Sequence, residues 1–188
     1  VTDAMRAYLR GSGATLIEQD AAAFRAYEGK GPVWSLFAQG NMSYDLDRND
    51  AEQPSLAEMT AKALEVLDRH KNGFFLMVEG AKIDYAGHSR CLPGSIIEML
   101  SFDLAVAEAL KFADTNGETL VIVTADHETG GLVVVDGDEH TGRVTGVYVS
   151  DDHTPAMLPV FAYGPGADKF CGTYMNTEIA RRIKSLIK

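Results

Sequence analysis

Two apolar runs in this chain are each followed by residue types that commonly bind metal ions. The runs are Phe74–Val78 and Leu120–Thr124, and the residues that follow them are Glu79, Asp84, His88, Asp126 and His127. Short apolar runs bounded by turn residues predict buried strands. Carboxylates and imidazoles are costly to bury unless they are paired or bound to a metal. The pattern therefore predicts one polar site at the carboxyl edge of a sheet.

A sixth candidate ligand, His153, lies shortly before a third apolar run, Leu158–Tyr163. Three carboxylates and three imidazoles without a thiolate suit zinc or another first-row divalent ion, with an oxygen-rich neighbouring site for magnesium. Six ligands exceed the needs of one tetrahedral site, so the set favours a cluster of two or three ions. Two divalent ions about 4 Å apart are a common arrangement for displacement at phosphorus.

Composition excludes several other classes of function. The net charge of −10 argues against a nucleic-acid partner, since phosphate backbones need clustered Lys and Arg. No apolar run approaches the roughly 20 residues of a membrane-spanning helix. Cys91 and Cys171 lack zinc-type spacing, so either one disulfide or two free thiols are possible. The opening Val1-Thr2-Asp3 has no start methionine and no signal peptide, which suggests a mature form or an excised piece.

The remaining pattern predicts a single α/β domain over residues 1–188. Ser55 and Glu58 form a capping-box pattern that opens a helix to about His70. Further helices are expected at Asp3–Arg10, Asp20–Tyr27, Ile96–Ala113 and Asn176–Ile187, and further strands at Ala14–Glu18 and Val33–Ala38. Helices that alternate with apolar strands predict a three-layer α/β/α fold with a mainly parallel sheet. Residues 132–152 are expected to form an antiparallel excursion.

Three motifs resemble the alkaline phosphatase family. They are Val78-Glu79-Gly80-Ala81-Lys82-Ile83-Asp84 with His88, then Thr124-Ala125-Asp126-His127-Glu128-Thr129-Gly130-Gly131, and then His153-Thr154 with Phe161-Ala162-Tyr163-Gly164-Pro165-Gly166. They occur in the family's order, from about Val33 to the C-terminus. The first two are highly specific in combination. The resemblance implies an alkaline-phosphatase-like fold, present here as a partial domain, and hydrolysis of phosphate monoesters.

The resemblance also implies roles for the six ligands. Asp84, His88 and His153 match the ligands of a first zinc, which activates water and stabilises the leaving oxygen. Asp126 and His127 match ligands of a second zinc, which holds a serine nucleophile as its alkoxide, and Glu79 matches a magnesium ligand. His140 precedes a similar Thr-Gly pair, but the family's ligand histidine lies ten residues before the tyrosine of Tyr-Gly-Pro, which selects His153.

Several family residues have no counterpart in this sequence. The Asp-Ser-Ala-type motif with the serine nucleophile is absent, and Ser12 in Gly11-Ser12-Gly13 is expected to end a helix. The aspartate that bridges the second zinc and magnesium, the magnesium-site threonine and the substrate-binding arginine are also missing. The chain is therefore interpreted as the C-terminal part of an alkaline phosphatase.

Two alternatives to this interpretation stay open. One is a catalytically inert metal-binding or structural fragment, and the other is a phosphodiesterase- or sulfatase-type hydrolase of the same superfamily. The family resemblance further implies a homodimeric parent enzyme located in the periplasm or secreted.

Overall fold

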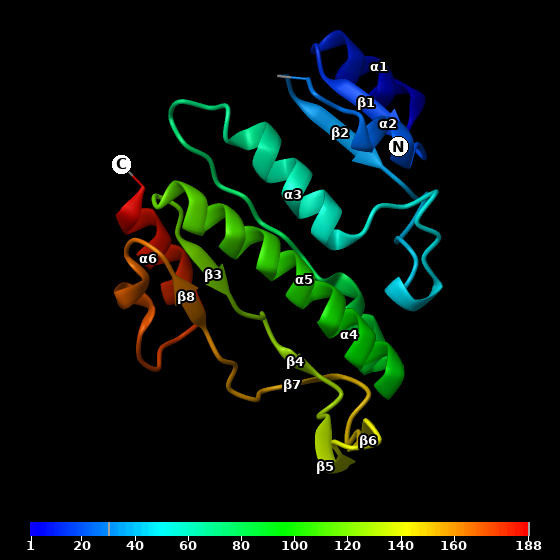
Figure 1. The fold of residues 1–188 in the computed structure, drawn as a ribbon, viewed down its shortest axis with the longest axis vertical. Helices are drawn as coiled ribbons and strands as arrows, with labels where there is room; N and C mark the ends of the chain where they lie inside the picture. Colours follow the sequence, from blue (N-terminus) through cyan, green and yellow to red (C-terminus); the bar gives the residue numbers. More distant parts are fainter. Residues whose placement is uncertain (30, 188) are drawn as a thin grey trace.

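The computed structural model describes residues 1–29 and 31–187 (Figure 1). Lys30 and Lys188, which fall within the expected single domain, lie outside the described residues. Helices and short strands alternate along most of the chain, so the α/β class is confirmed. Within the described residues, no helix is both long and apolar enough to cross a membrane.

The N-terminal part packs as a small unit with a core of its own. It consists of α1 (Asp3–Gly11), β1 (Thr15–Glu18), α2 (Ala21–Arg25) and β2 (Val33–Leu36), and β1 pairs with β2 in parallel. Ile17, Phe24 and Phe37 are buried together, and the rings of Phe24 and Phe37 meet edge-to-face at 5.2 Å between centroids. Asp20 caps α2, since its carboxylate accepts a hydrogen bond from the Ala23 amide. All four elements follow the sequence pattern.

Two long helices cross the middle of the molecule side by side (Figure 1). In α3 (Leu56–Leu67) the expected capping box is present: Ser55 accepts from the Glu58 amide, and Glu58 accepts from the Ser55 amide. The second helix, α5 (Leu92–Asn116), begins four residues earlier than expected, with Pro93 in its first turn, where the missing amide proton costs nothing. It ends at Gly117, whose left-handed backbone suits a helix C-terminus.

The sheet differs from the sequence expectation. In the described residues the strands form four separate two-stranded pieces: β1 with β2, β3 (Val121–Val123) with β8 (Phe161–Tyr163), β4 (Glu128–Thr129) with β7 (His153–Thr154), and β5 (Val133–Asp138) with β6 (Arg143–Val147). Only the first piece is parallel and the other three are antiparallel. The expectation of a mainly parallel sheet is therefore wrong for these residues.

The physical reason lies largely in Phe74–Val78, the run predicted to be a central strand. No residue from Phe74 to Glu79 takes part in a hydrogen bond with another described residue, so the run belongs to no ladder. Its side chains still alternate between half-buried and exposed, as in a strand with one covered face. The run is apolar and has the burial pattern of a strand, but among the described residues it has no neighbouring strand.

The molecule is correspondingly open. Its accessible surface is 12461 Å², whereas a compact monomer of 20.3 kDa exposes only about 8800 Å². Large apolar side chains contribute to the excess, including Phe75, Met77, Met157 and Phe161, each at least 64% exposed. The final helix, α6 (Thr177–Leu186), lies beside β8 and the short 3-10 turn Ala167–Phe170 (Figure 1).

Candidate metal centre

Asp84 and His88 lie on a helix that the sequence pattern did not predict, α4 (Ala81–His88). Gly80 begins this helix directly after the apolar run. Asp84 and His88 are four residues apart, so their side chains emerge on the same face of the helix. This spacing of four residues is the sequence signal from which the helix could have been predicted.

A short ladder between two distant segments brings the third ligand to the same place. In the antiparallel pair of β4 and β7, Thr129 lies opposite His153, and Glu128 lies opposite Thr154. Helix α4 lies tightly against this ladder at Gly87. A Cβ atom at Gly87 would approach the Thr129 carbonyl oxygen to 2.8 Å, so only glycine permits this distance.

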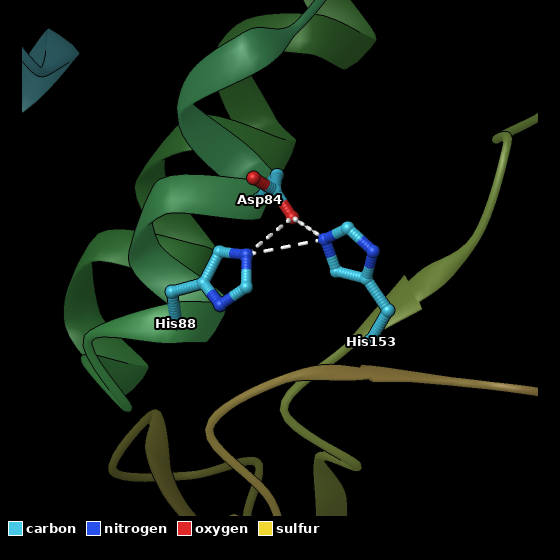
Figure 2. A group of neighbouring side chains, drawn as sticks. All are labelled: Asp84, His88 and His153. Carbon is cyan, nitrogen blue, oxygen red and sulfur yellow. Dashed lines mark hydrogen bonds and ion pairs between the residues drawn. The ribbon is translucent and has the colours of Figure 1, made fainter.

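Asp84, His88 and His153 form a compact group in which each offers one ligand atom (Figure 2). The two Nε2 atoms are 3.1 Å apart, and they lie 3.5 Å (His88) and 3.4 Å (His153) from Oδ1 of Asp84. Zinc bonds of about 2.0–2.1 Å in a tetrahedral site place neighbouring ligand atoms roughly 3.3 Å apart. The three donor atoms therefore fit three corners of a zinc tetrahedron.

The hydrogen bonds around the group orient its members. Nδ1 of His88 lies 2.7 Å from the Asp151 carbonyl oxygen, to which it can donate only when its proton is on Nδ1. That tautomer leaves Nε2 as a free ligand atom. The hydrogen bond to Asp151, reinforced by the nearby Asp84 carboxylate, raises the pKa of His88 above its ordinary value. The hydroxyl of Thr129 donates to Oδ1 of Asp84 at 2.6 Å.

His127 lies at the edge of this group. Its ring stacks on that of His153 with 3.5 Å between centroids, and its Nδ1 is 3.2 Å from the Thr129 hydroxyl. Its Nε2 is 3.2 Å from a carboxylate oxygen of Asp126, whose side chain is 84% exposed. Asp126 and His127 thus form a second pair beside the group of Asp84, His88 and His153.

Glu79 is not part of the three-residue group. It ends the unpaired run, its side chain is exposed, and none of the described residues donates a hydrogen bond to it. That Glu79 serves a different ion stays a prediction. His140, the competing histidine, lies in the turn between β5 and β6 and also stays outside the group.

Two residues of the site had no role assigned from sequence, Thr129 and Glu128. Thr129 contacts both Asp84 and His127. The Glu128 carboxylate accepts hydrogen bonds from the Thr154 hydroxyl and from the amides of Gly131 and Leu132. Burial raises the pKa of Glu128, but these bonds outweigh burial and hold it below its ordinary value. Both residues lie in the Thr124–Gly131 motif, and their place in that motif is the sequence signal that could have identified them.

Comparison with known proteins places this chain in a family. The family model for alkaline phosphatase matches residues 20–145. Alkaline phosphatase 4 of Bacillus subtilis is 31% identical over 223 residues, which cover 83% of this chain and 48% of that protein. Alkaline phosphatase of Escherichia coli is 34% identical over 194 residues, covering 83% of this chain and 41% of that protein. The chain spans about half the length of the curated relatives it matches.

Solved structures agree with the sequence comparison. Alkaline phosphatase from the Antarctic bacterium TAB5 superposes with a TM-score of 0.84 at 33% identity, covering 97% of this chain and 54% of that chain. A mutant of the TAB5 enzyme with magnesium bound gives a TM-score of 0.81 at 31% identity, covering 97% of this chain and 55% of that one. A cold-active enzyme from Shewanella sp. shares the fold, with a TM-score of 0.89 at 24% identity over all of this chain and 63% of that one.

Proposed function

Because the chain belongs to the alkaline phosphatase family, we propose that it supplies the metal-binding side of a phosphate monoester hydrolase. Asp84, His88 and His153 hold a catalytic zinc ion. Asp126 and His127 contribute to a second zinc site, and Glu79 contributes to a magnesium site. The nucleophilic serine comes from polypeptide outside these 188 residues.

One observation carries the proposal, namely the spacing of the three donor atoms in the Asp84 group. Separations of 3.1, 3.4 and 3.5 Å suit zinc, and three protein ligands are the number typical of catalytic zinc sites. A zinc ion bound there would supply a Lewis acid and lower the pKa of a bound water. The residues of the chain orient the donors: Asp151 fixes the ring of His88, and Thr129 fixes the carboxylate of Asp84.

The rest of the function follows from the family. We expect phosphate monoesters as substrates, a homodimeric parent enzyme, and a periplasmic or secreted location. The unpaired run Phe74–Val78 supports the idea that further polypeptide completes the site, since an apolar strand with free backbone groups is suited to pairing with another strand. Glu79, at the end of this run, would then lie beside the added strand.

Zinc titration of the 188-residue chain tests the metal site. We expect one tightly bound ion, because the second site keeps only Asp126 and His127 from this chain, too few ligands for tight binding. Asp84→Asn should abolish the tight site, whereas Asp136→Asn, a carboxylate on the distant β5–β6 hairpin, should not. Elemental analysis showing two zinc ions per chain, or equal binding by the Asp84 variant, would contradict the proposal.

Activity measurements test the reaction. A full-length enzyme carrying these residues, loaded with zinc and magnesium, should hydrolyse p-nitrophenyl phosphate faster than bis-p-nitrophenyl phosphate. Preference for the diester or for a sulfate ester would instead favour another branch of the superfamily.

A second candidate, an inert metal-binding fragment, is favoured by the missing serine motif. It predicts that the 188-residue chain alone binds zinc without turnover. Turnover by the chain alone that persists after removal of trace contaminating phosphatase would exclude this candidate.

A further inference from the structure

Arg90, two residues beyond the end of α4, has an unusual backbone. Its φ is +51°, and among the described residues other than glycine only Gln19 shares a positive value. For an ordinary residue this left-handed conformation costs about 1–2 kcal/mol. The Arg90 amide donates to the Gly87 carbonyl at 2.9 Å, so the chain turns sharply just after His88. Such a conformation in a residue other than glycine often marks a position with a function.

The side chain of Arg90 reaches the loop that leads to His153. Its Nε donates to the Ser150 carbonyl at 3.0 Å, and a terminal nitrogen lies 3.5 Å from the Asp151 carboxylate. The carbonyl of the same Asp151 faces Nδ1 of His88 at 2.7 Å. Residues 150 and 151 are therefore held by two side chains from the end of α4.

On the β4 side, backbone hydrogen bonds join residues 149–152 to Gly130. The amides of Val149 and Ser150 both donate to the Gly130 carbonyl at 3.0 Å, and the Gly130 amide donates to the Asp152 carbonyl at 3.0 Å. Among the described residues, hydrogen bonds therefore join residues 149–152 to the β4 side through the backbone and to the end of α4 through the side chains of His88 and Arg90. If Arg90 were lost, His88 would have to hold the loop on the α4 side alone.

We propose that Arg90 is a positioning residue for the zinc site. It holds the Ser150–Asp151 segment so that the Asp151 carbonyl keeps the proton of His88 on Nδ1, and so that His153 meets His88 at Nε2. The inference rests on the proposed function, because it concerns the affinity of the Asp84–His88–His153 group for zinc. The part played by Arg90 is indirect: its guanidinium contacts the loop, and the loop orients the ligands.

The sign of the expected effect separates positioning from simple electrostatics. Removing a positive charge near a cation site strengthens cation binding by Coulomb's law. Loss of positioning weakens it, because groups that orient ligand histidines commonly contribute about 10–100-fold to metal affinity. Since Arg90 acts one contact further out, we expect Arg90→Ala to weaken zinc binding by about 3–10-fold.

The experiment is a zinc titration with a competing chelator on the 188-residue chain. It compares Arg90→Ala and Arg90→Lys with Arg143→Ala, which removes the same charge from an exposed ion pair with Asp136 on the β5–β6 hairpin. Arg90→Lys should recover part of the affinity, and Arg143→Ala should match the unsubstituted chain. Thermal melting should be nearly unchanged in all three, because exposed ion pairs contribute at most about 1 kcal/mol. Equal or tighter zinc binding by Arg90→Ala would overturn the proposal.

A second readout does not depend on metal. Long-range ¹H–¹⁵N NMR spectra report which ring nitrogen of His88 carries the proton. We expect the Nδ1–H form in the metal-free chain and a mixture of tautomers in Arg90→Ala. Unchanged tautomers in Arg90→Ala would refute the positioning role even if the chain bound no zinc. Failure of the unsubstituted chain to bind zinc, with the tautomer shift present, would count against the proposed function and leave the role of Arg90 supported.

Discussion

Two segments that were both predicted to be strands reach different states in this molecule. Val33–Leu36 becomes β2 and pairs in register with β1, and it covers a core of buried side chains. Phe74–Val78 is equally extended but shares no hydrogen bond with the rest of the described chain. A strand therefore depends on two conditions, a sequence that favours an extended backbone and a neighbour that can accept its hydrogen bonds.

The difference between the two runs also appears in their side chains. Beside β2, Phe24 and Phe37 are each only 7% exposed, whereas Phe75 and Met77 on the unpaired run are 66% and 69% exposed. The unpaired run lies directly before Gly80 and α4, so the candidate metal site adjoins a segment with exposed apolar side chains and no strand pairing among the described residues.

The largest expected effect concerns the closed core. Phe24→Ala should reduce the free energy of unfolding by about 3–5 kcal/mol, because it leaves a cavity against Phe37. Urea unfolding followed by the fluorescence of Trp34, the only tryptophan, reports on this region because Trp34 lies on β2. A loss below about 1 kcal/mol would show that the N-terminal core is as open as the surface around Phe75.

A smaller loss is expected where α4 packs on the β4–β7 ladder. Gly87→Ala places a methyl group against the Thr129 backbone and should cost about 1–3 kcal/mol while weakening zinc binding. Gly11→Ala is a matched control, since apart from its chain neighbours and the backbone of its own helix no heavy atom lies within 4 Å of the new methyl position. Isothermal titration with zinc and thermal melting should separate the two variants, and identical behaviour would mean that α4 does not need this close approach.

The connection between the N-terminal unit and α3 should be sensitive to acid. The Glu58 carboxylate accepts two hydrogen bonds from Arg25, which together with the capping contacts lower its pKa to about 2 despite partial burial. A lowered carboxyl pKa contributes stability that is present above the unfolded value of 4.5 and is lost as the pH falls through about 2. Because the Glu58 side chain is 41% exposed, this contribution is about 1 kcal/mol.

Glu58→Gln tests this assignment, since glutamine retains the helix-capping contact but not the charge. The variant should be about 1 kcal/mol less stable than the unsubstituted chain at pH 7. The gap should close on acidification towards pH 2, as measured by urea unfolding at several pH values. A gap that stays constant with pH would show that the Arg25 contact contributes nothing.

The smallest effect is expected on the unpaired run. Phe75→Ala should change the free energy of unfolding of the 188-residue chain by no more than about 0.5 kcal/mol, since the ring is largely in water already. In a full-length enzyme the same substitution should cost several times more if another strand covers this surface. Equal, small effects in both proteins would mean that Phe75 stays exposed, and would remove the support that this run gives to the proposed function.

Most of the fold could be predicted from local pattern. The capping box at Ser55, the N-cap at Asp20 and the apolar periodicity of α3 and α5 are local signals, and these helices lie close to where the signals predict them, although α5 begins four residues earlier and α4 was missed. The direction of strand pairing was predicted wrongly because it depends on which segments meet, and alternation within one segment carries no such information. The ladder of β4 and β7 joins residues about 25 apart through only two pairs, too short for a recognisable pattern.

For the candidate site, too, some features could be predicted from the sequence and others only from the structure. The sequence by itself determined the chemical types of the candidate ligands, whereas the helix that puts Asp84 and His88 on one face was not predicted and came from the structure. The family resemblance implied that His153 joins them and that Glu79 serves another ion, but only the tertiary structure shows the three donor atoms close together and the contacts that Thr129 and Asp151 make with the group. The physical reason is that ligand type is a property of single residues, whereas a donor spacing near 3.3 Å requires close packing of segments some 65 residues apart.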